Sequence, residues 1–210
     1  MLIFLAERLA YLATPKTGST AVETALRSRA DIVFARGRKH VTAQRYQARV
    51  RPFLKETFRV APDSVAVMRE PVDQLRSWYR YRMREARDGA PQSTRGLSFD
   101  EFICAVISDD PPEFARVGSQ FAFLTNGKGR LVADHVFAWE DQPQFLAFLS
   151  RRLKDPVAPE QRNVSPDIPA PLDQITEAKL REARAAEFAL YQQIIDAGGQ
   201  LRRGEDRTAP

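Results

Sequence analysis

A short loop between an apolar run and a helix is the feature that most constrains this chain. Residues 9–13 are largely apolar, residues 14–18 read Thr-Pro-Lys-Thr-Gly, and a helical pattern begins at Ser19. The first N–H groups of a helix have no intrahelical partner and share the positive end of the helix dipole, so they attract anions. Gly18 lets the backbone approach an anion closely, and Lys16 adds a full positive charge. The segment therefore predicts a phosphate-binding corner between a strand and a helix.

A second corner of this kind follows the apolar run 64–68. The run has the composition of a buried parallel strand, and Arg69 follows it directly. Pro71 suits the first turn of a new helix, and Ser77 lies about two turns further along. A guanidinium offers a fork of donors that matches a phosphate, and a hydroxyl adds a small neutral donor. Arg69 and Ser77 are thus predicted to flank one anionic group.

The first loop differs from the usual nucleoside-triphosphate loop, in which the lysine follows the second glycine. Here Lys16 precedes Gly18, and Arg69 stands where a magnesium-dependent NTPase often carries an aspartate for the metal. The two corners therefore favour anions over a cation, and no metal is expected.

Together the two stretches resemble the sulfotransferases that use 3′-phosphoadenosine 5′-phosphosulfate (PAPS). Residues 15–20 resemble the family's 5′-phosphosulfate loop, and Arg69 with Ser77 matches its 3′-phosphate pair in residue types and spacing. Further stretches resemble the carbohydrate-type branch of the family, namely residues 39–43, 132–141 and 188–191. The resemblance extends from about residue 8 to about residue 195.

The resemblance implies a fold and a co-substrate. The fold would be α/β and P-loop-like, with three layers formed by a central parallel sheet and helices on both faces. PAPS would be the co-substrate and adenosine 3′,5′-bisphosphate the product. The residues that would bind the nucleotide are Lys16, Thr17, Gly18, Ser19, Thr20, Arg69 and Ser77. Lys16 would also be catalytic, because negative charge develops on the leaving phosphate in the transition state.

The acceptor must lose a proton as it attacks, so a general base is expected near the sulfur. His40 is the candidate, because it follows a predicted strand end in a basic loop and matches a histidine that some carbohydrate-type members use. Glu70 and Glu140 are alternative bases, whereas His135 lies within a predicted strand and is interpreted as structural. Residues 162–165 (Arg-Asn-Val-Ser) resemble a late family motif near the nucleotide.

The alternation of strands and helices predicts a parallel sheet. Strands are expected at 9–13, 31–35, 64–68 and 131–139, and helices at 19–29, 42–58, from 71, 98–108, 145–153 and 177–196. The length of 210 residues and the charged content of 28% suit one globular domain, expected over 1–200, with a disordered tail over 201–210.

Charge and cysteine content limit the partners. The net charge of +5 favours an anionic ligand, and Cys104, the single cysteine, excludes an intrachain disulfide. The chain shows neither a signal peptide nor the length of apolar sequence that a membrane anchor needs, so a cytoplasmic protein is expected.

Two other functions stay open at this point. A magnesium-dependent nucleotide kinase of related fold would need another lysine position and an aspartate for the metal. A non-catalytic nucleotide- or nucleic-acid-binding module is supported chiefly by charge, and no nucleic-acid motif is present, so nucleic acid is not an expected partner. The expected acceptor is a small molecule or a glycan with a hydroxyl or amine, and the sequence carries no signature that identifies it or the oligomeric state.

Overall fold

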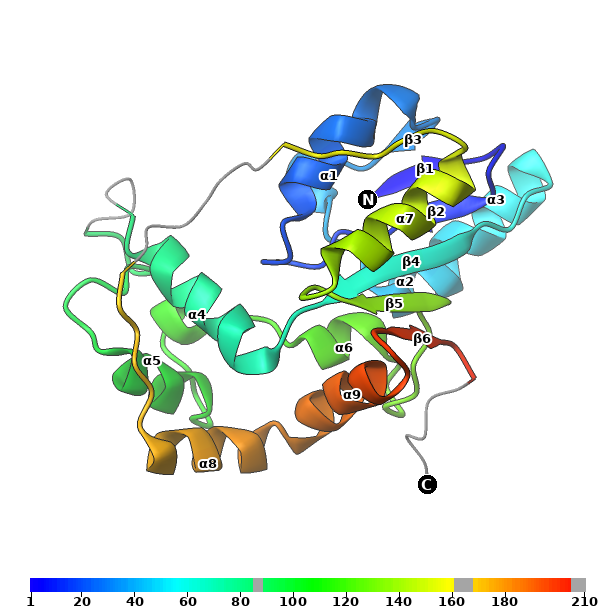
Figure 1. Cartoon of the computed structure of the whole chain (residues 1–210). Coiled ribbons are helices and arrows are strands. Elements are labelled where there is room, and N and C mark those ends of the chain that lie inside the picture. The colour runs from blue at the N-terminus through cyan, green and yellow to red at the C-terminus, as the bar shows by residue number, and fades with distance from the viewer. Residues whose placement is uncertain (85–88, 161–167, 205–210) are drawn as a thin grey trace.

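A mixed β-sheet organises the chain, whose computed structural model describes residues 1–84, 89–160 and 168–204. Within these ranges the sheet has six strands in the order β3-β1-β2-β4-β5-β6 (Figure 1). The strands are β1 (Leu2–Phe4), β2 (Leu9–Tyr11), β3 (Ile32–Val33), β4 (Asp63–Met68), β5 (His135–Ala138) and β6 (Gln200–Arg202). The middle strands β2, β4 and β5 run parallel, and β1, β3 and β6 pair antiparallel with their neighbours. The protein is therefore α/β with a sheet that is parallel only in its middle.

Helices connect the strands and cover the sheet. They are α1 (Ser19–Leu26), α2 (Ala43–Arg45), α3 (Arg51–Phe58), α4 (Pro71–Arg82), α5 (Phe99–Val106), α6 (Gln120–Leu124), α7 (Gln142–Leu153), α8 (Gln174–Ala183) and α9 (Ala185–Asp196). A π-helical turn (Tyr46–Val50) joins α2 to α3. In the described part of the chain, no helix is both long and apolar enough to cross a membrane.

Both faces of the sheet are buried. Because side chains of a strand alternate between its two faces, each strand contributes to two separate cores. On one face, Ala66 and Met68 of β4 belong to a core with residues of α3, α6 and α9, among them Leu54, Leu124, Leu190 and Ile194. On the other face, Val65 and Val67 belong to a core with residues of α1 and α7, among them Val22, Leu26, Phe145 and Leu149. This double coverage explains why 64–68 reads as a continuous apolar run.

A third core lies to one side of the sheet, where α4, α5 and α8 meet (Figure 1). Tyr79 of α4 lies 5.4 Å from the ring of Phe99 and 5.7 Å from the ring of Phe102. The expected capping box opens α5: Ser98 accepts from the Glu101 N–H and donates its own N–H to the Glu101 carboxylate. This core fixes α4, the helix that follows Arg69.

The strand pairing differs from the sequence prediction at the N-terminus. Residues 2–4 form a hairpin with β2, and β3 pairs with β1, so β3 runs parallel to β2 without being hydrogen-bonded to it. The hairpin turns at residues 5–8, where Arg8 has a left-handed φ of 53°. β1, where the sequence analysis expected no strand, thus lies between the two strands of the predicted strand-helix-strand unit.

Several predicted elements differ in length or continuity; the strands predicted over 9–13 and 31–35 are shortened to β2 and β3. The strand predicted over 131–139 begins at His135, because the side chain of Asp134 hydrogen-bonds to β4. The helix predicted over 177–196 is two helices, which meet near Arg184. β6 includes Leu201 and Arg202, which the sequence analysis assigned to the tail, whereas residues 205–210 lie outside the described ranges.

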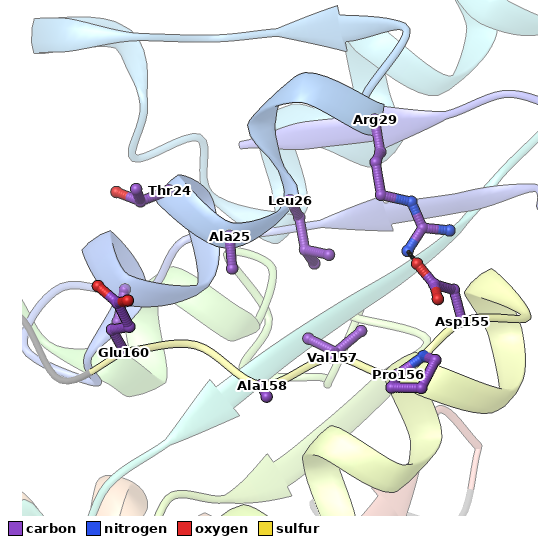
Figure 2. A pocket seen from close by; sticks show the side chains of 10 residues that line it. Thr24, Ala25, Leu26, Arg29, Asp155, Pro156, Val157, Ala158 and Glu160 are labelled. Atoms are coloured by element: carbon purple, nitrogen blue, oxygen red, sulfur yellow. Dashed lines mark hydrogen bonds and ion pairs between the residues drawn. The ribbon is translucent and has the colours of Figure 1, made fainter.

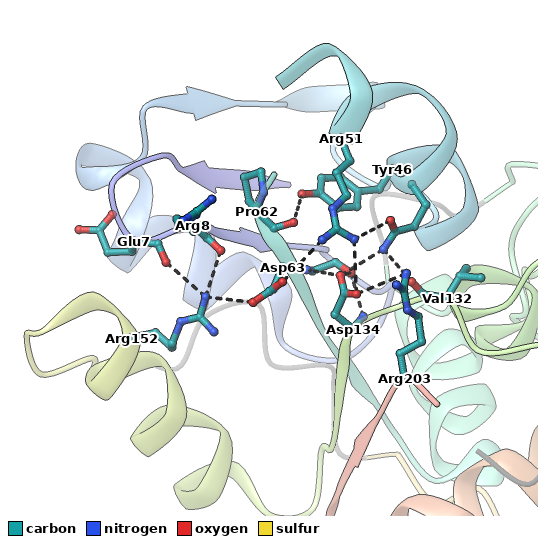
Figure 3. Close-up of polar contacts among 12 residues, drawn as sticks. Glu7, Arg8, Tyr46, Arg51, Pro62, Asp63, Val132, Asp134, Arg152 and Arg203 are labelled. Atoms are coloured by element: carbon teal, nitrogen blue, oxygen red, sulfur yellow. Dashed lines mark hydrogen bonds and ion pairs between the residues drawn. The ribbon is translucent and has the colours of Figure 1, made fainter. Parts of the chain in front are cut away.

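A polar network ties the strands together at the edge where β4 and β5 begin (Figure 3). Asp134, with a side chain 13% exposed, accepts from the Ser64 N–H at 2.8 Å and the Ser64 hydroxyl at 2.7 Å. Arg51 and Arg203 converge on the same carboxylate, at 3.6 and 3.4 Å. Asp134 thereby links β4, α3 and the end of β6.

We expect Asp134→Ala to lower the free energy of unfolding by about 2–4 kcal/mol, because it leaves the buried N–H and hydroxyl of Ser64 without their acceptor and removes the carboxylate that Arg51 and Arg203 approach. Urea titration with an unchanged slope would measure the loss. Asp110→Ala is the matched control, since Asp110 is exposed and pairs only loosely with Arg116. Equal unfolding midpoints for the two variants would contradict the role given to Asp134.

Candidate functional site

The β2–α1 corner has the backbone of an anion site. Lys16 has a φ of 67° and Gly18 a φ of 70°, so the loop turns twice through the left-handed region. A non-glycine residue there costs of the order of 1–2 kcal/mol, and such strain is often found at functional sites. Gly18 is the N-cap of α1, which has no side-chain cap and no acidic residue in its first turn. The first N–H groups of α1 are therefore available to a bound anion.

The hydroxyl side chains of this loop stabilise it from within. Thr17 is buried and donates to the Thr14 carbonyl at 2.9 Å. Thr20 accepts from the Lys39 ammonium at 3.2 Å, and Lys39 also pairs with Glu23 at 3.2 Å. Ser19 is buried at the start of α1. Thr17 and Thr20 thus hold the loop in shape, and the backbone is the better donor to a ligand.

The β4–α4 corner is built differently. Gln120, 1% exposed, binds both backbone groups of Arg69: its amide oxygen accepts at 2.9 Å and its amide nitrogen donates at 2.8 Å. Glu70 caps α4 by accepting from the Asp73 N–H at 2.8 Å. The N-terminus of α4 is therefore satisfied within the chain, so the Arg69 side chain is the donor that this corner offers to an anion.

The Arg69 guanidinium is a half-buried cation, on which Asp73 and Glu140 act electrostatically without forming an ion pair in the described structure. It lies over the ring of Trp139, 3.9 Å from the ring centre, and its Nε is buried with no acceptor. Among the described residues, no hydrogen bond or ion pair uses this guanidinium, and burial lowers its pKa. Burying a charge without a direct partner is costly, so this guanidinium has donors that an anion would satisfy.

The two corners adjoin one another. The Lys16 ammonium lies over α4, 3.9 Å from the ring centre of Tyr81 and 5.4 Å from that of Trp78. Ser77 is half-buried and lies on the same face of α4 as Tyr81, because residues four apart share a face of a helix. Since β2 and β4 are parallel neighbours, both corners lie at the edge where such sheets place ligands.

Sequence reasoning missed several polar atoms around these corners. Six buried side-chain atoms have no hydrogen-bond partner in the described structure. Tyr11 Oη and Gln144 Oε1 are two of them, and the other four belong to the two corners: Thr14 Oγ1, Gln74 Oε1, Trp78 Nε1 and the Nε of the predicted site residue Arg69. Thr14 and Gln74 are at most 1% exposed. The available signal was their position in the sequence: Thr14 lies three residues past the end of β2, and Gln74 lies about one turn into α4. Their concentration at the two corners indicates a region whose polar groups are completed by a ligand.

The His40 side chain contacts Ala13, the residue just before the loop 14–18. Its Nδ1 is 2.6 Å from the Ala13 carbonyl, and because a carbonyl only accepts, Nδ1 carries the hydrogen. Although the residue as a whole is exposed, partial burial of the ring lowers the pKa of His40. The neutral ring then presents a basic Nε2, as a general base requires. His135 lies instead at the opposite edge of the sheet, where its ring packs 5.0 Å from Phe148.

The alternative bases lie between α4 and α9. Glu140 accepts from the Glu70 N–H at 2.9 Å and from the Tyr191 hydroxyl at 2.8 Å. Burial raises the pKa of Glu70, whose carboxylate caps α4. Both carboxylates therefore have structural roles, and His40 is the better-placed base. Residues 162–165, which resemble a late family motif, lie outside the described residues.

A hollow of about 430 Å³ lies elsewhere, between α1 and residues 155–160 (Figure 2). Its cation is already neutralised, because Arg29 pairs with Asp155 at 2.8 Å and donates to the Leu153 carbonyl. In the described ranges, no group of three His, Cys, Asp or Glu side chains is arranged to hold a metal ion. We therefore centre the candidate site on Lys16 and Arg69.

Comparison with known proteins adds no relative: no protein-family model, no curated protein and no solved structure matches this chain.

We expect the His40 ring to titrate below its ordinary pKa of about 6.5 and to carry its neutral-state hydrogen on Nδ1. Because the unfolded chain then binds this proton at higher pH, protonation favours unfolding, and stability falls as the pH drops below about 6.5. NMR of the imidazole nitrogens, with His135→Gln to leave one ring, measures both properties. A midpoint above about 6.5, or a hydrogen on Nε2, would contradict this arrangement.

Proposed function

We propose that this chain is a PAPS-dependent sulfotransferase that transfers a sulfuryl group to a hydroxyl or amine of a small-molecule or glycan acceptor and releases adenosine 3′,5′-bisphosphate. The observation that supports this best is the Arg69 guanidinium, half-buried with no ion pair among the described residues and stacked on an indole that also reaches Gly18, the N-cap of α1. We also propose that the fold is P-loop-like and has three layers, as in that family.

The chemistry of the corners fits a nucleotide with two separate anionic groups. The first corner offers backbone N–H groups and the Lys16 ammonium, which suit the 5′-phosphosulfate. The second corner offers the Arg69 guanidinium and the Ser77 hydroxyl on an adjoining element, which suit the 3′-phosphate. The unpartnered polar atoms of Thr14 and Gln74 are further groups that such a ligand would satisfy.

The residues divide the catalytic work in the proposed reaction. Lys16, now over the Tyr81 ring, would turn to the bridging and 5′-phosphate oxygens, where charge accumulates as the S–O bond breaks. His40 would accept the proton of the attacking hydroxyl or amine on Nε2 while Nδ1–H stays bound to the Ala13 carbonyl. Because a sulfuryl group carries less negative charge than a terminal phosphoryl group, lysine and helix N-terminus can stabilise it without a metal.

Arg69→Ala tests nucleotide recognition. We expect affinity for adenosine 3′,5′-bisphosphate to fall about 10- to 100-fold, because charge-assisted hydrogen bonds contribute about 1.5–3 kcal/mol. Affinity for adenosine 5′-monophosphate should change little, since that nucleotide lacks the 3′-phosphate. Isothermal titration calorimetry measures both. Arg49→Ala, which removes an exposed charge from the π-helical turn, controls for net charge.

Equal affinities of Arg69→Ala and the wild type for the bisphosphate would contradict the assignment. A large thermal shift of the wild type with Mg-ATP and none with the bisphosphate would favour a kinase instead. Salt-dependent DNA binding without preference for the bisphosphate would favour a nucleic-acid-binding module.

Lys16→Ala tests the catalytic step. We expect turnover to fall about 100- to 1000-fold, as when one transition-state donor is lost, and bisphosphate affinity to fall much less. Release of the bisphosphate from PAPS, measured against sugar, phenol and amine acceptors, reports the turnover. Lys55→Ala on the exposed side of α3 is the control. Wild-type turnover in Lys16→Ala would remove Lys16 from the chemistry.

A further inference from the structure

Trp139 is the side chain that contacts both corners of the candidate site. It follows β5 directly, and its N–H donates to the Met68 carbonyl at 2.8 Å, which fixes it beside Arg69. Its ring lies under the Arg69 guanidinium at 3.9 Å. Its Nε1 lies 3.7 Å from the point that a Cβ on Gly18 would occupy. The indole thus separates a backbone anion site from a side-chain anion site and touches each.

We propose that Trp139 is a positioning residue that orients Arg69 for a 3′-phosphate and keeps it against the Gly18 corner. The inference rests on the proposed function, because it assigns to Trp139 the selectivity of that site for doubly phosphorylated nucleotides. Trp139 acts through Arg69 and transfers no proton or group itself.

Two physical properties of the pair support this role. An arginine side chain is long and loses much rotational freedom when it binds, so a stacked guanidinium is partly ordered before the ligand arrives. Indole is also the best aromatic surface for a cation, and it contacts the Arg69 guanidinium directly, whereas Asp73 and Glu140 act on that cation without an ion pair in the described structure. A carboxylate would compete with a phosphate for the guanidinium donors, whereas a ring stacked on its face leaves the edge donors to the phosphate.

The neighbouring groups agree with this division. The backbone of Arg69 is held on both sides by Gln120, so its side chain starts from a fixed point. The Trp139 carbonyl accepts from the Gln142 amide at 2.8 Å, so the backbone beneath the ring is held as well. Trp139 and Arg69 thus face each other from two anchored positions, one after each of the parallel strands β4 and β5.

Substitution of Trp139 tests the proposal on nucleotide selectivity. Trp139→Leu removes the ring but keeps an apolar side chain, and Trp139→Phe keeps a smaller ring. We expect Trp139→Leu to lower affinity for adenosine 3′,5′-bisphosphate about 3- to 30-fold and affinity for adenosine 5′-monophosphate much less. Trp139→Phe should recover most of the lost selectivity. Calorimetric titration of both nucleotides gives the ratio of affinities for each protein.

A double-mutant cycle separates positioning from a purely structural role. If Trp139 acts through Arg69, adding Trp139→Leu to Arg69→Ala should cause no further loss of bisphosphate affinity, so the two effects do not add. Urea unfolding checks that each variant is folded. Should Trp139→Leu fail to fold, Trp139→Met takes its place in the cycle, because it also removes the ring.

The outcomes distinguish this inference from the function on which it rests. A wild-type protein with equal affinity for the two nucleotides would overturn the proposed function. A selective wild type whose Trp139→Leu variant keeps the same selectivity, or a cycle in which the two losses add, would overturn only the role of Trp139.

Discussion

The parallel pairing of β2 with β4 is the constraint from which the rest of the site follows. Parallel strands end at the same edge of a sheet, so the loops after them are neighbours although the paired residues Leu9 and Asp63 are 54 positions apart in the sequence. Lys16 therefore reaches the rings of α4, and Trp139, after the next parallel strand, reaches both corners. The Asp134 network at the other edge holds these strands in register.

The two corners use different chemistry for similar ends. At the first, the proposed binding groups belong to the backbone: Gly18 leaves α1 without a side-chain cap, and Lys16 occupies a strained conformation that tertiary contacts must maintain. At the second, Glu70 already caps the helix, so the proposed binding group is a side chain. A half-buried guanidinium that is stacked on an indole and has no ion pair among the described residues gains from a bound anion.

Local secondary structure could be predicted from the sequence, whereas the pairing of distant strands could not. The loop 14–18, the strand 64–68, the helix after Pro71 and the capping box at Ser98 depend on neighbouring residues, and the structure confirms them. The insertion of β1 beside β2 and the contact of Trp139 with Gly18 depend on the order of strands, which periodicity does not encode. The predicted helix 177–196 is divided near Arg184. Just after this point Glu187 is buried, and its carboxylate accepts hydrogen bonds from the Ser119 hydroxyl and the Gln120 N–H.

The proposed function requires that one nucleotide spans both corners. A crystal structure of the protein with adenosine 3′,5′-bisphosphate measures this directly. The expected result has the 5′-phosphate at the N-terminus of α1 near Lys16 and the 3′-phosphate on the Arg69 guanidinium, with Trp139 still stacked beneath it. A nucleotide bound elsewhere, for example in the hollow between α1 and residues 155–160, or one that leaves Arg69 without an anion, would contradict the central claim.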